Sequence, residues 1–500
     1  MGLINKKLFL ASLLISTIMQ ADEWESLLPE FEAYAEKSRQ ECQAVGMAIA
    51  IVKDAKVIYA KGFGNRSLQD SRPVTVDTLF QIGSMSKSFT TALTALTVDR
   101  KQLQWEDAVI DHVPSFVMHD PWVTRAFEIE DLYAQRSGLV SYEGDTQALL
   151  GVAADKMIYN LRFFPPISSF RSQFAYQNIF FSVGANVLEQ VAKQSWHALV
   201  KKEFFDPLNM KSASSDLASY LKTDNRVGWH IRKPDGKVEL IPDTVETANW
   251  VYLFAPAGGI NATILDMAKW LILQTDLGVY QGKQIISKEN LARTHRPHIF
   301  AKTIYNLDTF YCLGWLQTEY SPYPIIWHNG ATSGVSNNMA IIPQDRLGLV
   351  ILCNCRDTVV AEALTLKFFD LYYKKPKVDW TQVCLEQQKQ EQKSKRSYPP
   401  LSNPLPSLPL EEYAGTYTNP VYGDLIITIS GKDLQGVLGP KKTRWLLKHY
   451  NRDTFSLFWS SVENGENKAT FYLTPQNKPE KLIIEILENE NMGTFLRKEK

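Results

Sequence analysis

Residues 77–93 read DTLFQIGSMSKSFTTAL, a short apolar run and a glycine followed by an amphipathic segment. The apolar side chains after the glycine recur with helical spacing, at Phe89, Leu93 and Leu96. This pattern predicts a helix that begins at about Ser84. On such a helix Ser84 and Lys87 lie on one face, about 5–6 Å apart at Cβ, so the lysine can reach the serine hydroxyl.

The pair Ser84 and Lys87 has the chemistry of a nucleophile and its base. A serine hydroxyl is a poor nucleophile until a base removes its proton. A lysine with the reference pKa of about 10.4 is protonated at neutral pH, but burial or a second cation lowers that pKa. Free backbone N–H groups at a helix N-terminus also suit an oxyanion. The same spacing recurs at Ser219 and Lys222 without this setting, and we interpret that match as chance.

A second candidate element is Tyr176-Gln177-Asn178, which precedes a long apolar helix. A tyrosine between cations can act as a phenolate base or as a proton shuttle, and an asparagine amide can hold a substrate carbonyl and a lysine. Taken alone, Tyr176 is more simply interpreted as a half-buried aromatic side chain. The same spacing also occurs in the C-terminal region, at Tyr417-Thr418-Asn419.

A third candidate element is His328-Asn329-Gly330, at the end of the strand-like run IIWH. A glycine here would let a substrate lie close along the strand edge. The backbone N–H of Ala331 could then supply an oxyanion donor opposite that of Ser84. Taken alone, His328 is more simply interpreted as a structural histidine.

Outward from these elements, the chain predicts an α+β fold. Residues 45–63 read as two strands joined by a polar turn, and residues 325–353 read as three more strands. A closing helix carries one apolar stripe, at Val360, Leu364, Phe368 and Leu371. Residues 105–240 predict a mostly helical subdomain. We therefore expect an antiparallel sheet flanked by helices, plus that subdomain.

The C-terminal quarter of the chain changes character. Residues 376–398 are strongly polar and predict a solvated helix, and residues 399–409 contain five prolines, which disfavour helices and sheet ladders alike. Beyond them, short alternating runs separated by Gly, Asn and Pro predict a small antiparallel β-barrel. The expected domains are residues 22–375, a linker over 376–409 and the barrel over 410–500.

The N-terminus and the overall charge bear on location and partners. Residues 1–21 read as a secretory signal, because Lys6 and Lys7 precede an apolar run too short to span a bilayer. An N-terminal anchor or an amphipathic helix is the alternative. We expect export to a periplasm or to the outside, with no transmembrane segment in the mature chain. The 500 residues carry no net charge, so nothing indicates a nucleic-acid partner.

The cysteines and histidines predict no metal site. Five cysteines are too few for a disulfide scaffold, and an odd number leaves at least one thiol free. Cys353 and Cys355 lie two apart in an apolar run, which suits two small buried side chains better than a metal or redox pair. The eight histidines form no recognisable ligand pattern.

Together, the three elements in the order Ser-x-x-Lys, Tyr-x-Asn, His-x-Gly resemble the active site of the serine β-lactamase and penicillin-binding-protein superfamily. The class C β-lactamase branch is the most similar, with its D-alanyl-D-alanine carboxypeptidases, D-aminopeptidases and related esterases. The resemblance covers about residues 30–370 and includes the stretches AQRSGL (134–139) and APAGGINATILDMAKW (255–270). Residues 410–500 resemble the lipocalin-like C-terminal domain found on some of these hydrolases.

This resemblance implies roles for the candidate residues. Ser84 would be the acylated nucleophile, and Lys87 and Tyr176 would share the base and proton-shuttle work. The substrate-binding residues would be Asn178, His328, Gly330 and Ala331. Lysine usually stands at the position of His328 in β-lactamases of this branch, and histidine is mostly neutral at pH 7. A weaker grip on a substrate carboxylate favours a peptidase or esterase over a true β-lactamase.

The resemblance implies no metal or organic cofactor. We expect a small-molecule or short-peptide substrate, with peptidoglycan as one partner to consider. A non-catalytic receptor or cell-wall binding protein on the same fold is the alternative function. The barrel has two interpretations, a lid over the active site or a module that binds a partner.

Overall fold

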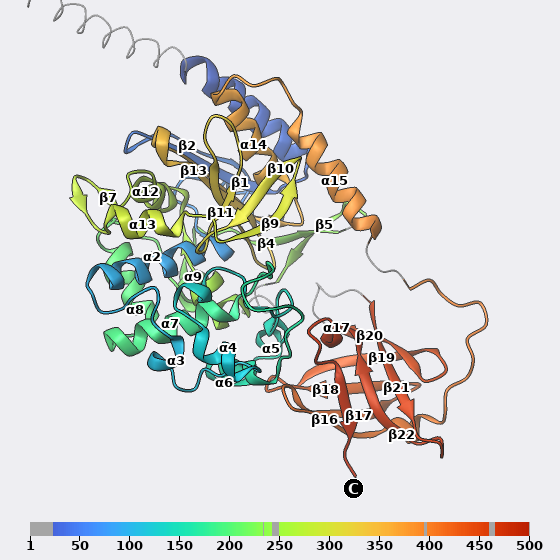
Figure 1. Ribbon diagram of the computed structural model, residues 1–500. Coiled ribbons are helices and arrows are strands. Elements are labelled where there is room, and N and C mark those ends of the chain that lie inside the picture. Colours follow the sequence, from blue (N-terminus) through green and yellow to red (C-terminus); the bar gives the residue numbers. More distant parts are fainter. Residues whose placement is uncertain (1–23, 234, 243–249, 395–397, 460–465, 500) are drawn as a thin grey trace, which may run out of the picture.

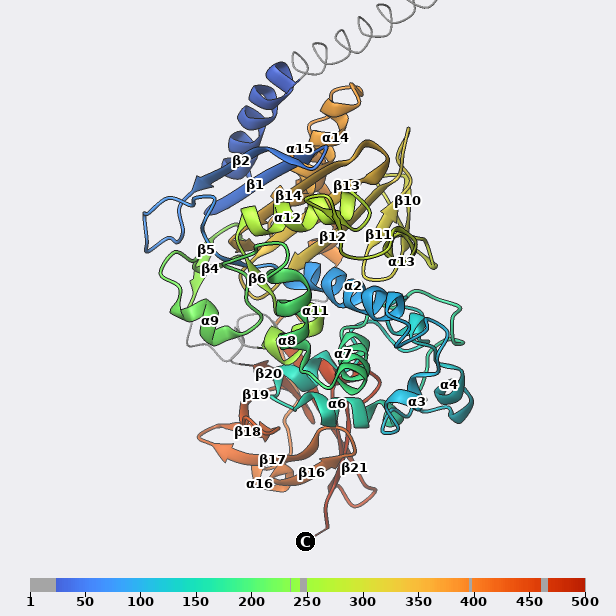
Figure 2. The same cartoon turned by 90° about the vertical axis from the view of Figure 1, so that its left-hand side faces the viewer.

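The computed structural model describes residues 24–233, 235–242, 250–394, 398–459 and 466–499 (Figure 1). A large sheet covered by helices lies at one end, a helical part adjoins it, and a β-barrel lies beside the helical part (Figures 1 and 2). The predicted signal falls outside the described residues. Within these ranges, no helix combines the length and apolar character that crossing a membrane requires.

The large sheet has eight antiparallel strands in the order β2-β1-β14-β13-β12-β11-β10-β9. Their bounds are β1 Gly46–Lys53, β2 Lys56–Gly64, β9 Ile299–Ile304, β10 Leu307–Tyr311, β11 Leu316–Thr318, β12 Ile325–Ala331, β13 Ser336–Ile342 and β14 Leu347–Cys353. The β1–β2 hairpin turns at Asp54 and Ala55, whose φ angles of 48° and 61° suit a turn that matches the twist of the strands. The predicted antiparallel sheet is confirmed.

Alternate residues of β1 enter cores on opposite faces of the sheet. One face packs on residues 24–41 and on α14 (Val360–Tyr372), through Met47, Ile49 and Ile51. The other face packs on α12 (Ile264–Thr275) and α2 (Ser86–Asp99), through Ala48, Ala50 and Val52. Because both faces are packed, the sheet is a rigid support for the helices and turns that contact it.

The helical part lies between the sheet and the barrel. Its helical segments are η1 Gly83–Met85, α3 Val109–His112, α4 Pro121–Ala126, α5 Asp145–Leu149, α6 Ala154–Asn160, α7 Ile179–Ala192, α8 Trp196–Val200, α9 Leu217–Lys222, α10 Trp250–Leu253, α11 Ala255–Gly258 and α13 Lys288–Thr294. The expected helical range 105–240 ends in two strands, β4 (Trp229–Arg232) and β5 (Val238–Ile241). Strands β9 to β11 were also not expected, because they are short and β9 is a half-exposed edge with little apolar alternation.

The C-terminal region forms a closed barrel of eight antiparallel strands, in which β16 pairs with β23. The strands are β16 Gly415–Asn419, β17 Gly423–Ser430, β18 Asp433–Leu438, β19 Thr443–Asn451, β20 Thr454–Trp459, β21 Glu466–Leu473, β22 Pro479–Ile484 and β23 Thr494–Arg497. The predicted antiparallel barrel is confirmed. Its hydrophobic interior is continuous with that of the helical part, so the barrel is packed against the rest of the molecule.

The five cysteines are all buried and unpaired. Cys353 ends β14, and Cys355 lies in the short strand β15 (Cys355–Arg356). Burial raises the pKa of Cys355 to about 12, so this side chain stays a thiol. Among the described residues, no three His, Cys, Asp or Glu side chains are grouped so that they could hold a metal ion.

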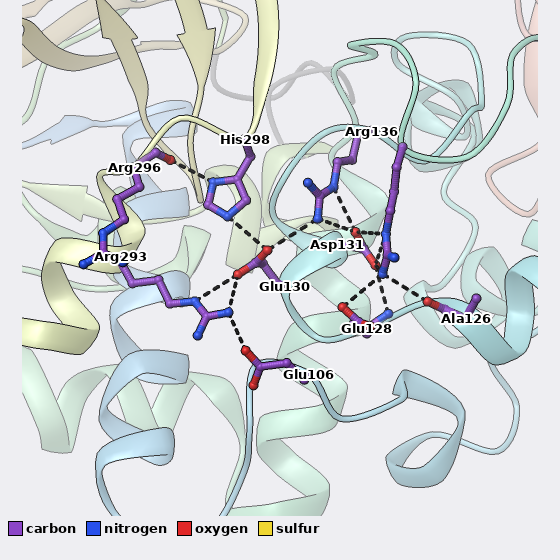
Figure 3. A network of polar contacts seen from close by, with 10 residues as sticks. Glu106, Ala126, Glu128, Glu130, Asp131, Arg136, Arg293, Arg296 and His298 are labelled. Carbon is purple, nitrogen blue, oxygen red and sulfur yellow. Dashed lines mark hydrogen bonds and ion pairs between the residues drawn. The ribbon is translucent and has the colours of Figure 1, made fainter.

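A network of charged side chains joins the helical part to the start of β9 (Figure 3). Asp131 is buried and accepts hydrogen bonds from Arg136 and Arg171, at 2.9 and 2.5 Å. Glu130 binds Arg293 at 2.7 Å and His298 at 3.1 Å. Burial opposes ionisation of Glu130, but these two partners outweigh it and lower its pKa to about 2. The network therefore holds together segments that are far apart in the sequence.

We predict that Asp131→Asn destabilises the protein by about 3 kcal/mol, because two guanidinium groups lose their shared buried carboxylate. Urea unfolding would measure the change. The matched control is Glu106→Gln, which removes a mostly exposed carboxylate from Arg293 and should cost under about 1 kcal/mol. Equal losses for the two variants would contradict this account of the network.

Candidate active site

Ser84 lies in η1, a single turn that leads into α2. Gly83 enters this turn with a φ of +58°, a conformation that side chains other than glycine rarely adopt. The hydroxyl of Ser86 fixes the turn, because it donates to the Gly83 carbonyl at 2.7 Å and accepts from the N–H of Ile260 at 3.1 Å. Ser84 is partly exposed, whereas Lys87, one turn further along, is fully buried.

The Lys87 amine contacts three oxygen atoms. Nζ lies 2.6 Å from Asn178 Oδ1, 3.0 Å from the Ala257 carbonyl and 3.1 Å from Ser84 Oγ. Burial lowers the pKa of Lys87 to about 7, although Asp145 opposes the shift when it is ionised. A neutral amine has two N–H groups and one lone pair. The two carbonyl oxygens can only accept, so they use both N–H groups and leave the lone pair for the Ser84 hydroxyl.

Tyr176 lies over this pair. Its ring is 4.8 Å from Lys87 Nζ, and Ser84 is a hydrogen-bond partner of its hydroxyl. Burial and the neighbouring Tyr311 raise the pKa of Tyr176 well above its ordinary value, so the phenol keeps its proton at neutral pH. Of the two roles considered from the sequence, this environment suits a proton shuttle better than a phenolate base.

Two residues not singled out from the sequence hold the segment of Tyr176. Gln135 has a φ of 58° and clamps the backbone of Gln177, donating to its carbonyl at 3.0 Å and accepting from its N–H at 2.5 Å. Asp145 Oδ2 accepts from Asn178 Nδ2 at 2.7 Å. Gln135 lies in the stretch AQRSGL already noted, but no sequence pattern marks Asp145.

His328 is buried in β12 and makes two hydrogen bonds. Its Nδ1 lies 2.6 Å from the Asn329 carbonyl, which can only accept, so Nδ1 carries the proton. Its Nε2 then accepts from the Tyr311 hydroxyl at 3.1 Å. Burial and the nearby Lys87 lower the pKa of His328 to about 3. The position at which lysine is usual in the resembling β-lactamases is therefore filled by an uncharged imidazole in this chain.

Gly330 and Ala331 lie directly against the turn of Ser84. A Cβ at Gly330 would be 1.9 Å from the Ile82 carbonyl oxygen, and one at Gly83 would be 2.8 Å from the Ala331 nitrogen. The space beside Gly330 is therefore occupied by main chain. The expected role of Gly330 in substrate binding stays a prediction. The same packing places the main chain of Gly83, the residue before Ser84, against that of Ala331. An oxyanion hole would require the N–H groups of Ser84 and Ala331 to lie close together.

The remaining motif matches lie elsewhere. Ser219 lies in the first turn of α9, where its hydroxyl donates to Asp216, the residue that caps the helix, at 2.8 Å. Tyr417 and Asn419 lie in β16 of the barrel. The structure brings together five candidate residues from three distant stretches of chain: Ser84, Lys87, Tyr176, Asn178 and His328.

Residues 31–368 match the family model described as Beta-lactamase. The chain belongs to the beta-lactamase family. Residues 400–498 of this family member match a second model, described as a domain of unknown function (DUF3471). The resemblance drawn from the three motifs is thus confirmed over more than half of the chain.

Relatives of this beta-lactamase-family protein include hydrolases. An unguisins hydrolase, ungD′, of Aspergillus campestris is 26% identical over 445 residues, which cover 81% of this chain and 78% of that protein. Protein flp of Staphylococcus aureus is 23% identical over 340 residues, covering 66% and 64% of the two chains. The octameric penicillin-binding protein homologue from Pyrococcus abyssi has the same fold, with a TM-score of 0.62, 18% identity and coverage of 92% and 98%.

We predict that Gly330→Ala lowers the rate at which a fluorophosphonate labels Ser84 by about 100-fold, because the new methyl group displaces the turn that carries the serine. Labelling rates followed by intact mass would measure the effect. The control is Gly258→Ala, whose Cβ would meet its nearest neighbours at an ordinary 3.9 Å. Wild-type labelling by Gly330→Ala would show that the close packing on Ile82 does not position Ser84.

Proposed function

We propose that this beta-lactamase-family protein is a serine hydrolase that cleaves an amide or ester through an acyl-enzyme on Ser84. The observation that carries the proposal is the buried Lys87 amine. Its Nζ lies within hydrogen-bond distance of the Asn178 and Ala257 carbonyl oxygens and of Ser84 Oγ. When the amine is neutral, the two carbonyls take its N–H groups and its lone pair is left for Ser84. The hydrolase name of the fungal relative supports the same class of reaction.

In the proposed acylation, Ser84 Oγ attacks the substrate carbonyl and its proton passes to Lys87 Nζ. The backbone N–H groups of Ser84 and Ala331 stabilise the oxyanion. When the carbon–nitrogen or carbon–oxygen bond breaks, Tyr176 gives its proton to the leaving group and regains one from Lys87. Water then attacks the acyl-enzyme, the serine recovers a proton, and the carboxylic acid leaves.

Among these hydrolases, we propose a peptidase or esterase rather than a true β-lactamase. The uncharged His328 offers no fixed cation for a substrate carboxylate. Aromatic rings gather beside the Ser84 partner Tyr176 instead, since Tyr142 and Tyr311 lie 5.3 and 6.1 Å from its ring. These rings suit the flat or apolar part of an acyl group better than an anion.

We also propose that residues 1–21 direct export, on the strength of the two lysines and the apolar run that follows them. The mass of the mature protein from the producing cell would decide this. A chain that begins near Asp22 supports export, and a chain that retains its first residues contradicts it.

We predict that a fluorophosphonate adds once to the wild-type protein and not to Ser84→Ala, as seen in the intact mass. Ser219→Ala is the matched control and should label fully, since the Ser219 hydroxyl only donates to the capping residue Asp216 in α9. A parallel incubation with a penicillin separates the substrate classes. Slow loss of a penicillin adduct favours a peptidase, rapid turnover favours a lactamase, and labelling by the fluorophosphonate alone favours an esterase or a narrow peptidase. No adduct on folded protein would favour the non-catalytic binding protein.

We predict that the labelling rate rises with pH through about 7, because Lys87 acts as a base only after it loses its proton. Lys87→Arg keeps a cation that does not deprotonate, so its rate should fall by at least about 100-fold. Rates between pH 5 and 9, corrected for spontaneous loss of the reagent, would test this. A pH-independent wild-type rate would exclude Lys87 as the base.

A further inference from the structure

Glu490 of the barrel reaches into the helical part of the molecule. It follows α17 (Glu485–Glu488) and is only 6% exposed. Its carboxylate accepts from the Thr146 N–H at 3.1 Å, the Thr146 hydroxyl at 2.5 Å and the Gly144 N–H at 3.3 Å. A fourth bond, of 2.6 Å, comes from Tyr422 within the barrel. Three of the four donors to Glu490 therefore belong to the hydrolase domain.

These donors lie at the start of α5. The residue before this helix is Gly144, in a left-handed conformation with a φ of 84°, and it has no side chain that could cap the helix. The backbone N–H groups at a helix start need acceptors, and Ser, Thr, Asp or Asn usually supplies one. Here Glu490, 344 residues beyond Thr146, supplies the acceptor from another domain.

The first residue of α5 connects this contact to the candidate active site. Asp145 lies between Gly144 and Thr146, and its carboxyl accepts from Asn178 at 2.7 Å. Asn178 in turn accepts from Lys87 at 2.6 Å. We infer that Glu490 is a positioning residue of the hydrolase, which holds the start of α5 so that Asp145 fixes Asn178 against Lys87. This inference rests on the function proposed above.

Two other buried carboxyl groups lie near Glu490, so a negative charge at this place is costly. Glu143 is fully buried near it, and in the described part of the chain neither of its carboxyl oxygens has a hydrogen-bond partner. Burial and the neighbouring Glu490 raise the pKa of Glu143 to about 10 and that of Asp145 to about 8. Of these three carboxyl groups, Glu490 alone has four donors. It is therefore the one best able to carry a negative charge here.

Other contacts keep the barrel attached without Glu490. The N–H of Lys441 donates to the Leu150 carbonyl at 3.3 Å, and Asn160 donates to the Val421 carbonyl at 3.2 Å. Apolar residues of both parts also share one core. A substitution at Glu490 should therefore loosen α5 while the barrel stays docked.

The test compares Glu490→Ala, Glu490→Gln and Glu488→Ala in the full chain. Glu488 is an exposed residue two positions away that accepts from the Gly493 N–H at 3.0 Å but, among the described residues, makes no hydrogen bond with α5, and it is the matched control. The first readout is the rate at which a fluorophosphonate labels Ser84. The second is hydrogen exchange of peptides that cover residues 142–150 and the barrel strands.

We expect Glu490→Ala to label about 10- to 100-fold more slowly than wild type. Its amides at Gly144 and Thr146 should exchange faster, while the barrel strands stay protected. Glu490→Gln keeps an oxygen that can accept from Thr146 and should recover the rate to within about threefold of wild type. Glu488→Ala should match wild type in both readouts.

Three outcomes would overturn the inference. Wild-type labelling by Glu490→Ala overturns the positioning role alone. Loss of protection across the barrel in both Glu490 variants would assign Glu490 to docking of the domain instead. If the wild-type protein does not label at Ser84, the proposed function fails, and the role of Glu490 in it fails as well.

Discussion

The rest of the candidate site depends on the burial of one amine. A lysine without access to water loses the solvation that favours its charged form, so its pKa falls toward neutrality. Because two carbonyl oxygens use the N–H groups of Lys87, the direction of its lone pair is set as well. Those carbonyls come from Asn178, at the start of α7, and from Ala257, in α11. Three helices, α2, α7 and α11, thus supply Lys87 and the two acceptors that surround its Nζ atom.

The rigidity of this arrangement comes from packing around α2. Phe89 stacks on Trp270 of α12 with their ring centroids 3.7 Å apart, and Trp270 Nε1 donates to Ser88 at 3.1 Å. On the other side, Gly330 of β12 packs directly against the main chain of Ile82. The turn of Ser84 is therefore fixed between the sheet and a packed helix. Catalytic geometry held by such elements is more precise than geometry held by loops alone.

The barrel is part of this construction. It shares a hydrophobic core with the helical part, and one of its carboxylates completes the start of α5. Its strands β16 to β23 form a closed barrel, so each of them is paired on both sides. A closed barrel is a rigid support for the loop that carries Glu490. The sequence left two interpretations of the barrel, a lid over the active site or a module that binds a partner. The inferred role of Glu490 adds a third, in which the barrel holds the start of α5 in place.

The sequence by itself determined the class of fold, the barrel and the three motifs, because each is written in local patterns. Strand alternation, a helical stripe after Gly83 and the spacing from Ser84 to Lys87 depend only on near neighbours in the chain. Only the tertiary structure decided the charge states and the supporting residues. A pKa depends on burial and on partners from distant segments, so the neutral state of His328 follows from surroundings that no motif records. Asp145 and Glu490 lack any motif for the same reason. Asp145 contacts Asn178 from a distant segment, and Glu490 contacts Gly144 from another domain.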